Sequence, residues 1–127
     1  MPENGVFNYE KHLVAIENHS WEFNFLLSGG ERTNLLINSP NARITRIEPE
    51  NSVIRKIIVN YDQRDYTTGF KFFNEEGFIV LQSGSFGYTD YTINLEEGER
   101  IVGIKSRHFQ LGTAKHSNVI FVLGKPE

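Results

Sequence analysis

Short apolar segments separated by turn residues run along the chain, and this pattern constrains the fold more than any other feature of the sequence. In residues 21–27, Trp21, Phe23 and Phe25 alternate with polar residues, which is the period of a half-buried β-strand. Gly, Pro, Asn and Ser recur between such segments about every 8–12 residues. The pattern predicts about ten or eleven short strands without a helix, and therefore an all-β fold.

The spacing of these segments also predicts which strands are neighbours. We expect strands at 12–17, 21–27, 33–37, 43–48, 52–61, 69–73, 78–82, 88–95, 99–106 and 119–123. The first two should form a hairpin, as should 69–73 with 78–82, and 99–106 should lie beside 119–123. Segment 52–61 is apolar on both faces, which is typical of a central strand. A group of phenylalanines is expected in the core: Phe70, Phe72, Phe73 and Phe78.

Length and composition limit the possible functions. The 127 residues suit a single all-β domain, residues 1–127. The chain has no Cys, so it lacks disulfides, a thiolate nucleophile and Cys-based metal sites. Its formal charge of −3 argues against nucleic acid as a partner, and no apolar run approaches the roughly 20 residues of a membrane span. The absence of a signal-peptide pattern and of Cys favours a cytoplasmic protein.

Two polar segments are candidates for ligand binding. In the first, Gly87, Tyr88, Asp90 and Tyr91 combine aromatic faces, a carboxylate and a Gly-flanked backbone, which are the groups that contact the CH surface and hydroxyls of a sugar. A flexible loop that leads into an ordinary strand is the alternative. In the second, Asp62, Asp65 and Tyr66 could hold a hydroxyl or Ca²⁺, although a solvated turn is the simpler interpretation.

The sequence carries no recognisable catalytic or metal-binding motif. None of the four His residues has the H-E-x-x-H spacing, and the acidic segment lacks the ligand series of an EF-hand loop. The segment Gly84-Ser85-Phe86-Gly87 does not match Gly-x-Ser-x-Gly. We therefore expect a protein that is not an enzyme and that uses no metal and no cofactor.

Four strand-like segments together resemble the jacalin-like, β-prism I lectin family, over about residues 44–124. They are Ile54-Arg55-Lys56-Ile57-Ile58-Val59-Asn60-Tyr61, the Gly-led Gly69–Phe73, Ile93-Asn94-Leu95-Glu96-Glu97-Gly98-Glu99-Arg100-Ile101-Val102-Gly103-Ile104, and Asn118–Leu123. The resemblance implies an antiparallel Greek-key β-prism of three short sheets. A β-sandwich is the alternative, because residues 1–43 could either complete a prism or form one sheet of a sandwich.

The resemblance also implies a function, a non-catalytic module that binds carbohydrate (a glycan) through loops at one end of the fold. The family's sugar-binding loop carries Gly-x-x-x-Asp, and no Gly of this chain is followed by Asp four residues later. The alternative is therefore a structural or protein-interaction subunit of a larger assembly, with the same fold and without a sugar site. Its partner would be another protein, or a second copy paired through sheet edges.

Overall fold

The computed structural model describes residues 3–4, 13–19, 22–28, 43–62, 67–87, 89–108 and 116–125. All regular secondary structure in these ranges is β-strand, and every pairing is antiparallel. The strands are β1 (Glu3–Asn4), β2 (Leu13–His19), β3 (Glu22–Leu27), β4 (Arg43–Arg46), β5 (Lys56–Tyr61), β6 (Thr67–Phe73), β7 (Ile79–Gly84), β8 (Thr89–Asn94), β9 (Arg100–His108) and β10 (His116–Gly124). The all-β, antiparallel prediction is confirmed. Within the same ranges, no helix is long and apolar enough to cross a membrane.

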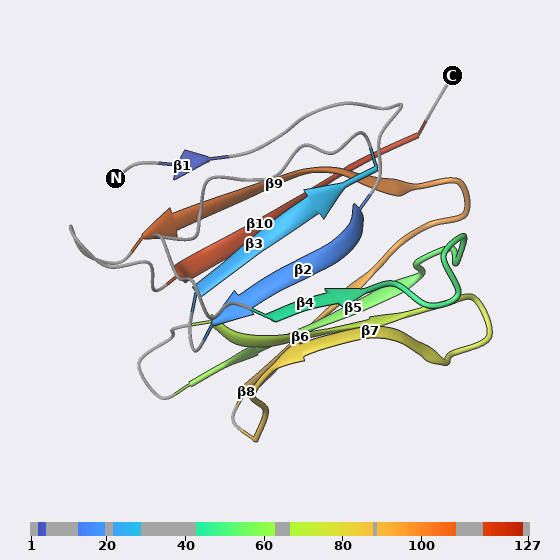
Figure 1. Ribbon diagram of the computed structural model, residues 1–127. Helices are drawn as coiled ribbons and strands as arrows, with labels where there is room; N and C mark the ends of the chain where they lie inside the picture. Colours follow the sequence, from blue (N-terminus) through green and yellow to red (C-terminus); the bar gives the residue numbers. More distant parts are fainter. Residues whose placement is uncertain are drawn as a thin grey trace.

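The described strands form three sheets, with the strand orders β1-β9-β10, β3-β2-β4 and β7-β6-β5-β8. Figure 1 shows the β5–β8 sheet at the bottom of the view, the β2–β4 sheet above it, and β9 and β10 above both. In the β5–β8 sheet, three strands connected in sequence are followed by a fourth that returns beside the first, which is the strand order of a Greek key.

The predicted neighbours are paired in the structure. β2 pairs with β3, β6 with β7 and β9 with β10, and β5 is a central strand between β6 and β8. The strand predicted at 52–61 is too long, because β5 begins only at Lys56. Ser52 is held in a turn instead, since both its backbone N and its Oγ donate to the Pro49 carbonyl oxygen, at 3.0 and 2.6 Å. The strand predicted at 33–37 lies outside the described residues.

All three sheets contribute aromatic side chains to one core. Phe70 of β6 lies at the centre of this cluster, with ring centroids 5.0 Å from Phe23, 5.2 Å from Phe25 and 5.9 Å from Phe121. Phe25 and Phe121, from the other two sheets, are 5.8 Å apart, and most of these pairs meet edge to face. Edge-to-face packing is a preferred geometry of aromatic rings, so this cluster joins the three sheets to one another.

The predicted core phenylalanines are only partly confirmed. Phe70 and Phe72 are fully buried and Phe73 is half-buried, whereas Phe78 is 66% exposed. Phe78 follows the turn that joins β6 to β7, and its backbone exchanges hydrogen bonds with Asn74 at the base of that turn. The predicted hairpin of 69–73 with 78–82 is confirmed, but Phe78 closes the turn and does not reach the core.

Candidate functional site

The pairing of β5 with β8 brings the two polar segments to the same end of the β5–β8 sheet. Tyr61 and Thr89 are register partners, so Asp62, which follows β5, lies beside the start of β8. We call this the Tyr61 end of the sheet, and the opposite end, where Lys56 pairs with Asn94, the Lys56 end. Three of the predicted site residues, Asp65, Tyr66 and Tyr88, lie outside the described residues.

Asp90 is held in place by a side chain that the sequence did not single out. Asn60 is its register partner on β5, is only 1% exposed, and donates from Nδ2 to Asp90 Oδ1 at 2.6 Å. Thr68 Oγ1 in turn donates to Asn60 Oδ1 at 3.0 Å. A buried amide with both ends satisfied has a fixed orientation, so it also fixes the exposed carboxylate of Asp90. The signal for Asn60 was its position, a polar residue between Val59 and Tyr61 in a strand predicted to be central.

Tyr91 is accessible but points away from Asp90. Neighbouring residues of a strand face opposite sides of the sheet, so Tyr91 lies on the side of its register partner Val59, which is buried. The Tyr91 side chain is nevertheless 59% exposed, because β8 is an edge strand among those described. The structure therefore brings Asp62 and Asp90 to one end of the sheet and does not bring Asp90 and Tyr91 onto one face.

Two glycines set the course of the chain into the loop before β8. Gly69 and Gly84 are cross-strand partners, and a Cβ on Gly69 would lie 2.6 Å from the Ser85 carbonyl oxygen and 2.9 Å from the Phe86 ring. Phe86 therefore covers Gly69, and Lys71 Nζ lies 4.5 Å from the centre of the same ring. The exposed Gly87 follows with a φ of 124°, a backbone conformation that favours glycine, and has open space where a side chain would be.

A buried hydroxyl for which the described residues supply no partner lies at the same end. Thr67 begins β6, opposite Tyr61, and is fully buried. In the part of the chain that the structure describes, no hydrogen-bond partner reaches its Oγ1. Such a group costs free energy of folding unless it finds a partner, and because Thr67 is fully buried its hydroxyl is not accessible to a ligand at the Tyr61 end.

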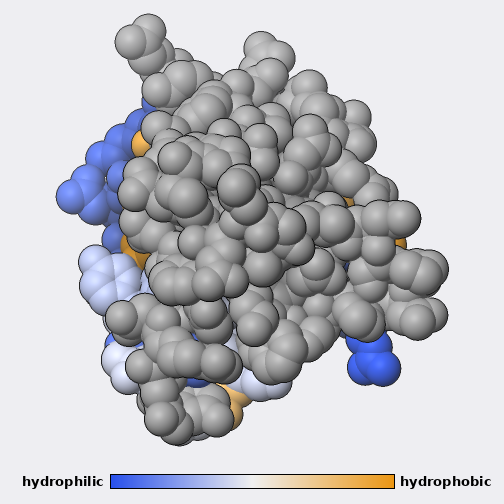
Figure 2. Space-filling model, turned by 90° about the vertical axis from the view of Figure 1, so that its left-hand side faces the viewer, coloured by the Kyte–Doolittle hydropathy of each residue, from blue (hydrophilic) through white to orange (hydrophobic). Residues whose placement is uncertain are grey.

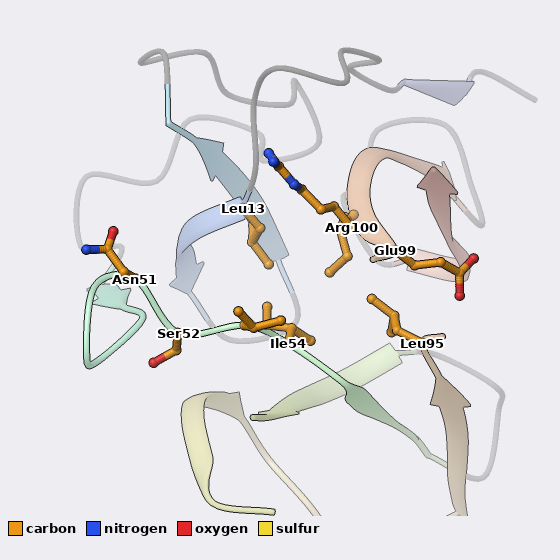
Figure 3. A pocket seen from close by; sticks show the side chains of 9 residues that line it. Leu13, Asn51, Ser52, Ile54, Leu95, Glu99 and Arg100 are labelled. Atoms are coloured by element: carbon orange, nitrogen blue, oxygen red, sulfur yellow. The ribbon is translucent and has the colours of Figure 1, made fainter. Parts of the chain in front are cut away.

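The structure also contains a pocket at the Lys56 end that the sequence did not predict. It has a volume of about 280 Å³ and is lined by Leu13 of β2, by the segment before β5 and by the segment from β8 into β9: Asn51, Ser52, Val53, Ile54, Leu95, Glu99, Arg100 and Ile101. Figure 3 shows the side chains of Leu13, Ile54 and Leu95 directed toward one another. Leu13, Ile54 and Leu95 have the sequence pattern of ordinary core residues, so a pocket between them could not be predicted from the sequence.

An open groove of about 730 Å³ separates β4 from β7. Both are edge strands of their sheets among the strands described, and the chain passes from one sheet to the other at Ile47 and Glu48, whose backbone N atoms donate to Val14 and Val80. The groove includes the exposed side chains of Ile44 and Ile79. On the face seen in Figure 2, the described residues are mostly hydrophilic, with small separate hydrophobic areas.

Within the described ranges, no three His, Asp or Glu side chains come together as metal ligands. Lys125 Nζ and Glu96 Oε2 form an exposed ion pair at 3.1 Å, at the Lys56 end. The arrangement at the Tyr61 end is thus a set of hydrogen-bonding groups around one oriented carboxylate. The sequence matches no protein-family model, and it matches no curated protein at a significant level.

Proposed function

We propose that this chain is a non-catalytic recognition module with a jacalin-like β-prism fold, and that it binds carbohydrate at the Tyr61 end of the β5–β8 sheet. Support for the prism comes from three sheets that share one aromatic core, since a sandwich has two. The Greek-key order of β5 to β8 agrees with it. Fold does not determine function, so the proposal depends on the site.

The observation that carries the proposal is the orientation of Asp90 by the buried Asn60. A carboxylate on the surface of a strand ordinarily moves with its own side chain, and fixing it has an entropic cost. Here the buried amide has already fixed it, while the rest of the Asp90 side chain remains exposed. Pre-orientation of this kind strengthens the binding of hydroxyl groups, because less freedom is lost when the ligand arrives.

The groups around Asp90 match the needs of a sugar. The carboxylate accepts hydrogen bonds from hydroxyls, and the open space at Gly87 lets a ligand approach the backbone. Asp62 supplies a second carboxylate at the same end. We assign Tyr88, Asp65 and Tyr66 to the same binding region from their sequence positions, with Tyr88 as the aromatic face. The case for Tyr91 as a sugar-binding residue is weaker, because its side chain lies on the other side of β8.

The test is a glycan-array screen of the purified chain, followed by titration of the best glycan into variants. Asp90→Asn keeps an oxygen that Asn60 can donate to and removes the charge, so binding should fall while the fold is retained. Tyr88→Ala should also weaken binding. Glu75→Gln removes the same charge from an exposed turn at the Lys56 end and is the matched control. Full binding by Asp90→Asn would refute this site, and folded protein that binds no glycan would refute the function.

A second function, a protein-interaction subunit, is favoured by the groove between β4 and β7. Two sheet edges and two exposed isoleucines, Ile44 and Ile79, border one open channel. Sheet edges pair readily with other strands, and exposed apolar side chains add to such contacts. Sedimentation of the native chain against Ile79→Lys tests self-association through this edge. A concentration-dependent dimer that is lost in Ile79→Lys would support it, and a monomer at all concentrations would exclude a homo-oligomer.

A further inference from the structure

The pocket at the Lys56 end is a built feature that the proposed glycan site does not use. It lies at the opposite end of the β5–β8 sheet from Asp90, and it draws its walls from residues far apart in sequence, Leu13, 51–54 and 95–101. Its walls are firmly placed. Leu95 N donates to Arg55 O at 2.8 Å, and Arg55 Nη1 donates to Glu96 O at 3.2 Å, which ties the β8–β9 turn to the start of β5.

The interior of the pocket is aliphatic. Leu13, Leu95 and Ile101 are almost completely buried, and Ile54 is half-buried beside them. Val53 is 45% exposed and stands at the opening. A cavity lined by such side chains offers no partners to hydroxyls, so it favours a hydrocarbon group over a sugar. The glycan of the proposed function is therefore not a suitable occupant.

The polar residues around this pocket differ in whether their side chains already have a hydrogen-bond or ion-pair partner. Glu99 Oε1 accepts a hydrogen bond from Glu96 N at 2.5 Å, and in Figure 3 its carboxylate points away from the apolar side chains. Ser52 Oγ is bonded to the Pro49 carbonyl. Arg100 also lines the pocket, and in Figure 3 its guanidinium ends above Leu13, on the side away from Ile54 and Leu95. Among the residues described, no carboxylate pairs with the Arg100 guanidinium, and the ion pair that these residues do form joins Lys125 to Glu96.

We propose that this pocket binds a small amphipathic carboxylate. The hydrocarbon part occupies the space between Leu13, Ile54 and Leu95, and the carboxylate pairs with the guanidinium of Arg100 at the opening. Arginine suits this role because its planar guanidinium meets a carboxylate with two parallel hydrogen bonds. The volume of about 280 Å³ is at the small end for ligand pockets, which limits the occupant to a short chain or a single ring.

The experiment compares three probes that share one hydrocarbon chain: octanoate, octan-1-ol and octylammonium. Each is titrated into the isotope-labelled chain, and the affinity is taken from backbone amide shifts followed by nuclear magnetic resonance. Octanoate should shift the amides of 51–54 and 95–101 in a saturable way. Octan-1-ol should bind roughly tenfold more weakly because it lacks the charge-assisted hydrogen bonds, and octylammonium should bind more weakly still.

Three variants separate the parts of the site. Arg100→Gln should weaken octanoate roughly tenfold, to the level of octan-1-ol, because only the charged partner is lost. Val53→Trp should fill the opening of the pocket and abolish the binding of both octanoate and octan-1-ol. Lys56→Gln removes one cation at the same end of the sheet, where the Lys56 ammonium lies over the Phe73 ring and does not line the pocket, so it should leave octanoate binding unchanged.

Several results would overturn the proposal. If Arg100→Gln and the native chain bind octanoate with equal affinity, Arg100 is not the partner of the carboxylate. Equal affinity of the native chain for octanoate and octan-1-ol would lead to the same conclusion. Saturable shifts confined to amides outside the pocket, or no saturable shift with millimolar octanoate, would remove the site. If Val53→Trp does not fold, Arg100→Gln still decides the question, because Arg100 is exposed and its replacement spares the core. A loss of glycan binding in an Asp90 variant would not affect the octanoate result, because Asp90 and the pocket lie at opposite ends of the β5–β8 sheet.

Discussion

Replacing Gly84 by Ala should destabilise the protein more than the same change at Gly69 or Gly98. Gly84 has a φ of 95°, and its Cβ would collide with the Thr68 carbonyl oxygen and lie 2.7 Å from Gly69 Cα. Both contacts are backbone atoms of the neighbouring strand, so neither can rotate away. The strands β6 and β7 would have to separate at the base of the loop that leads to Asp90.

Substitutions at three glycines allow the cost of the left-handed backbone conformation and the cost of steric contacts to be measured separately. Gly98 has a φ of 85° with nothing within 4 Å of an added Cβ, so Gly98→Ala should cost only the left-handed conformation, about 1–2 kcal/mol. Gly69→Ala should cost mainly the contacts with Ser85 and Phe86, about 1–3 kcal/mol. Gly84→Ala combines both and should lose about 3 kcal/mol or more.

The assay is urea unfolding followed by circular dichroism, with the midpoint and slope compared across the three variants. A lower midpoint with an unchanged slope reports lost stability of a two-state fold. The expected order of stability loss is Gly84→Ala, then Gly69→Ala, then Gly98→Ala. Equal losses for Gly84→Ala and Gly98→Ala would refute the reasoning, because they would mean that β6 and β7 do not approach closely at Gly84.

Three further predictions use the same measurement. Thr67→Val should raise stability by about 1 kcal/mol, because it removes a buried hydroxyl that lacks a partner among the described residues, and a loss would reveal a hydrogen bond to that oxygen. Asp90→Ala should lose about 1–3 kcal/mol because the buried Asn60 amide loses its acceptor, whereas Asp90→Asn should lose less than about 1 kcal/mol. Phe70→Ala should lose about 3–5 kcal/mol, and Phe78→Ala, at an exposed turn, should stay within about 0.5 kcal/mol; similar losses would contradict the assigned core.

The strands were predictable wherever the information was local. Alternation in 21–27 and the turn Asn74–Gly77 depend on neighbouring residues, and both predictions agree with the structure. β1 (Glu3–Asn4) was not predicted, because its two polar residues form a strand only through pairing with Arg107 and Ser106 of β9. The grouping of the strands into three sheets depends on such distant pairings, which local periodicity does not contain.

The candidate glycan site was predictable in part for the same reason. Asp90 could be named from its residue type and its neighbours. Asn60 could not, since its role follows from the register that sets it opposite Asp90, thirty positions away in sequence. The side of the sheet on which the Tyr91 side chain lies depends on the same register. A residue's chemistry can be predicted from sequence more readily than the partner that orients it.

The carboxylate pocket and the error in the length of β5 have one cause. The two neighbours of β5 end at Phe73 and Asn94, the register partners of Lys56, so a strand that began at Ser52 would have no described strand to pair with before Lys56. The hydrogen bonds of Ser52 to Pro49 turn the chain away before the ladder begins, which leaves Ile54 facing Leu13 and Leu95 across a cavity. Apolar periodicity indicated that these residues are buried, and it could not indicate whether neighbouring strands fill the space between them. The turn at Ser52 thus places in the wall of the pocket a segment that its apolar periodicity had assigned to a strand.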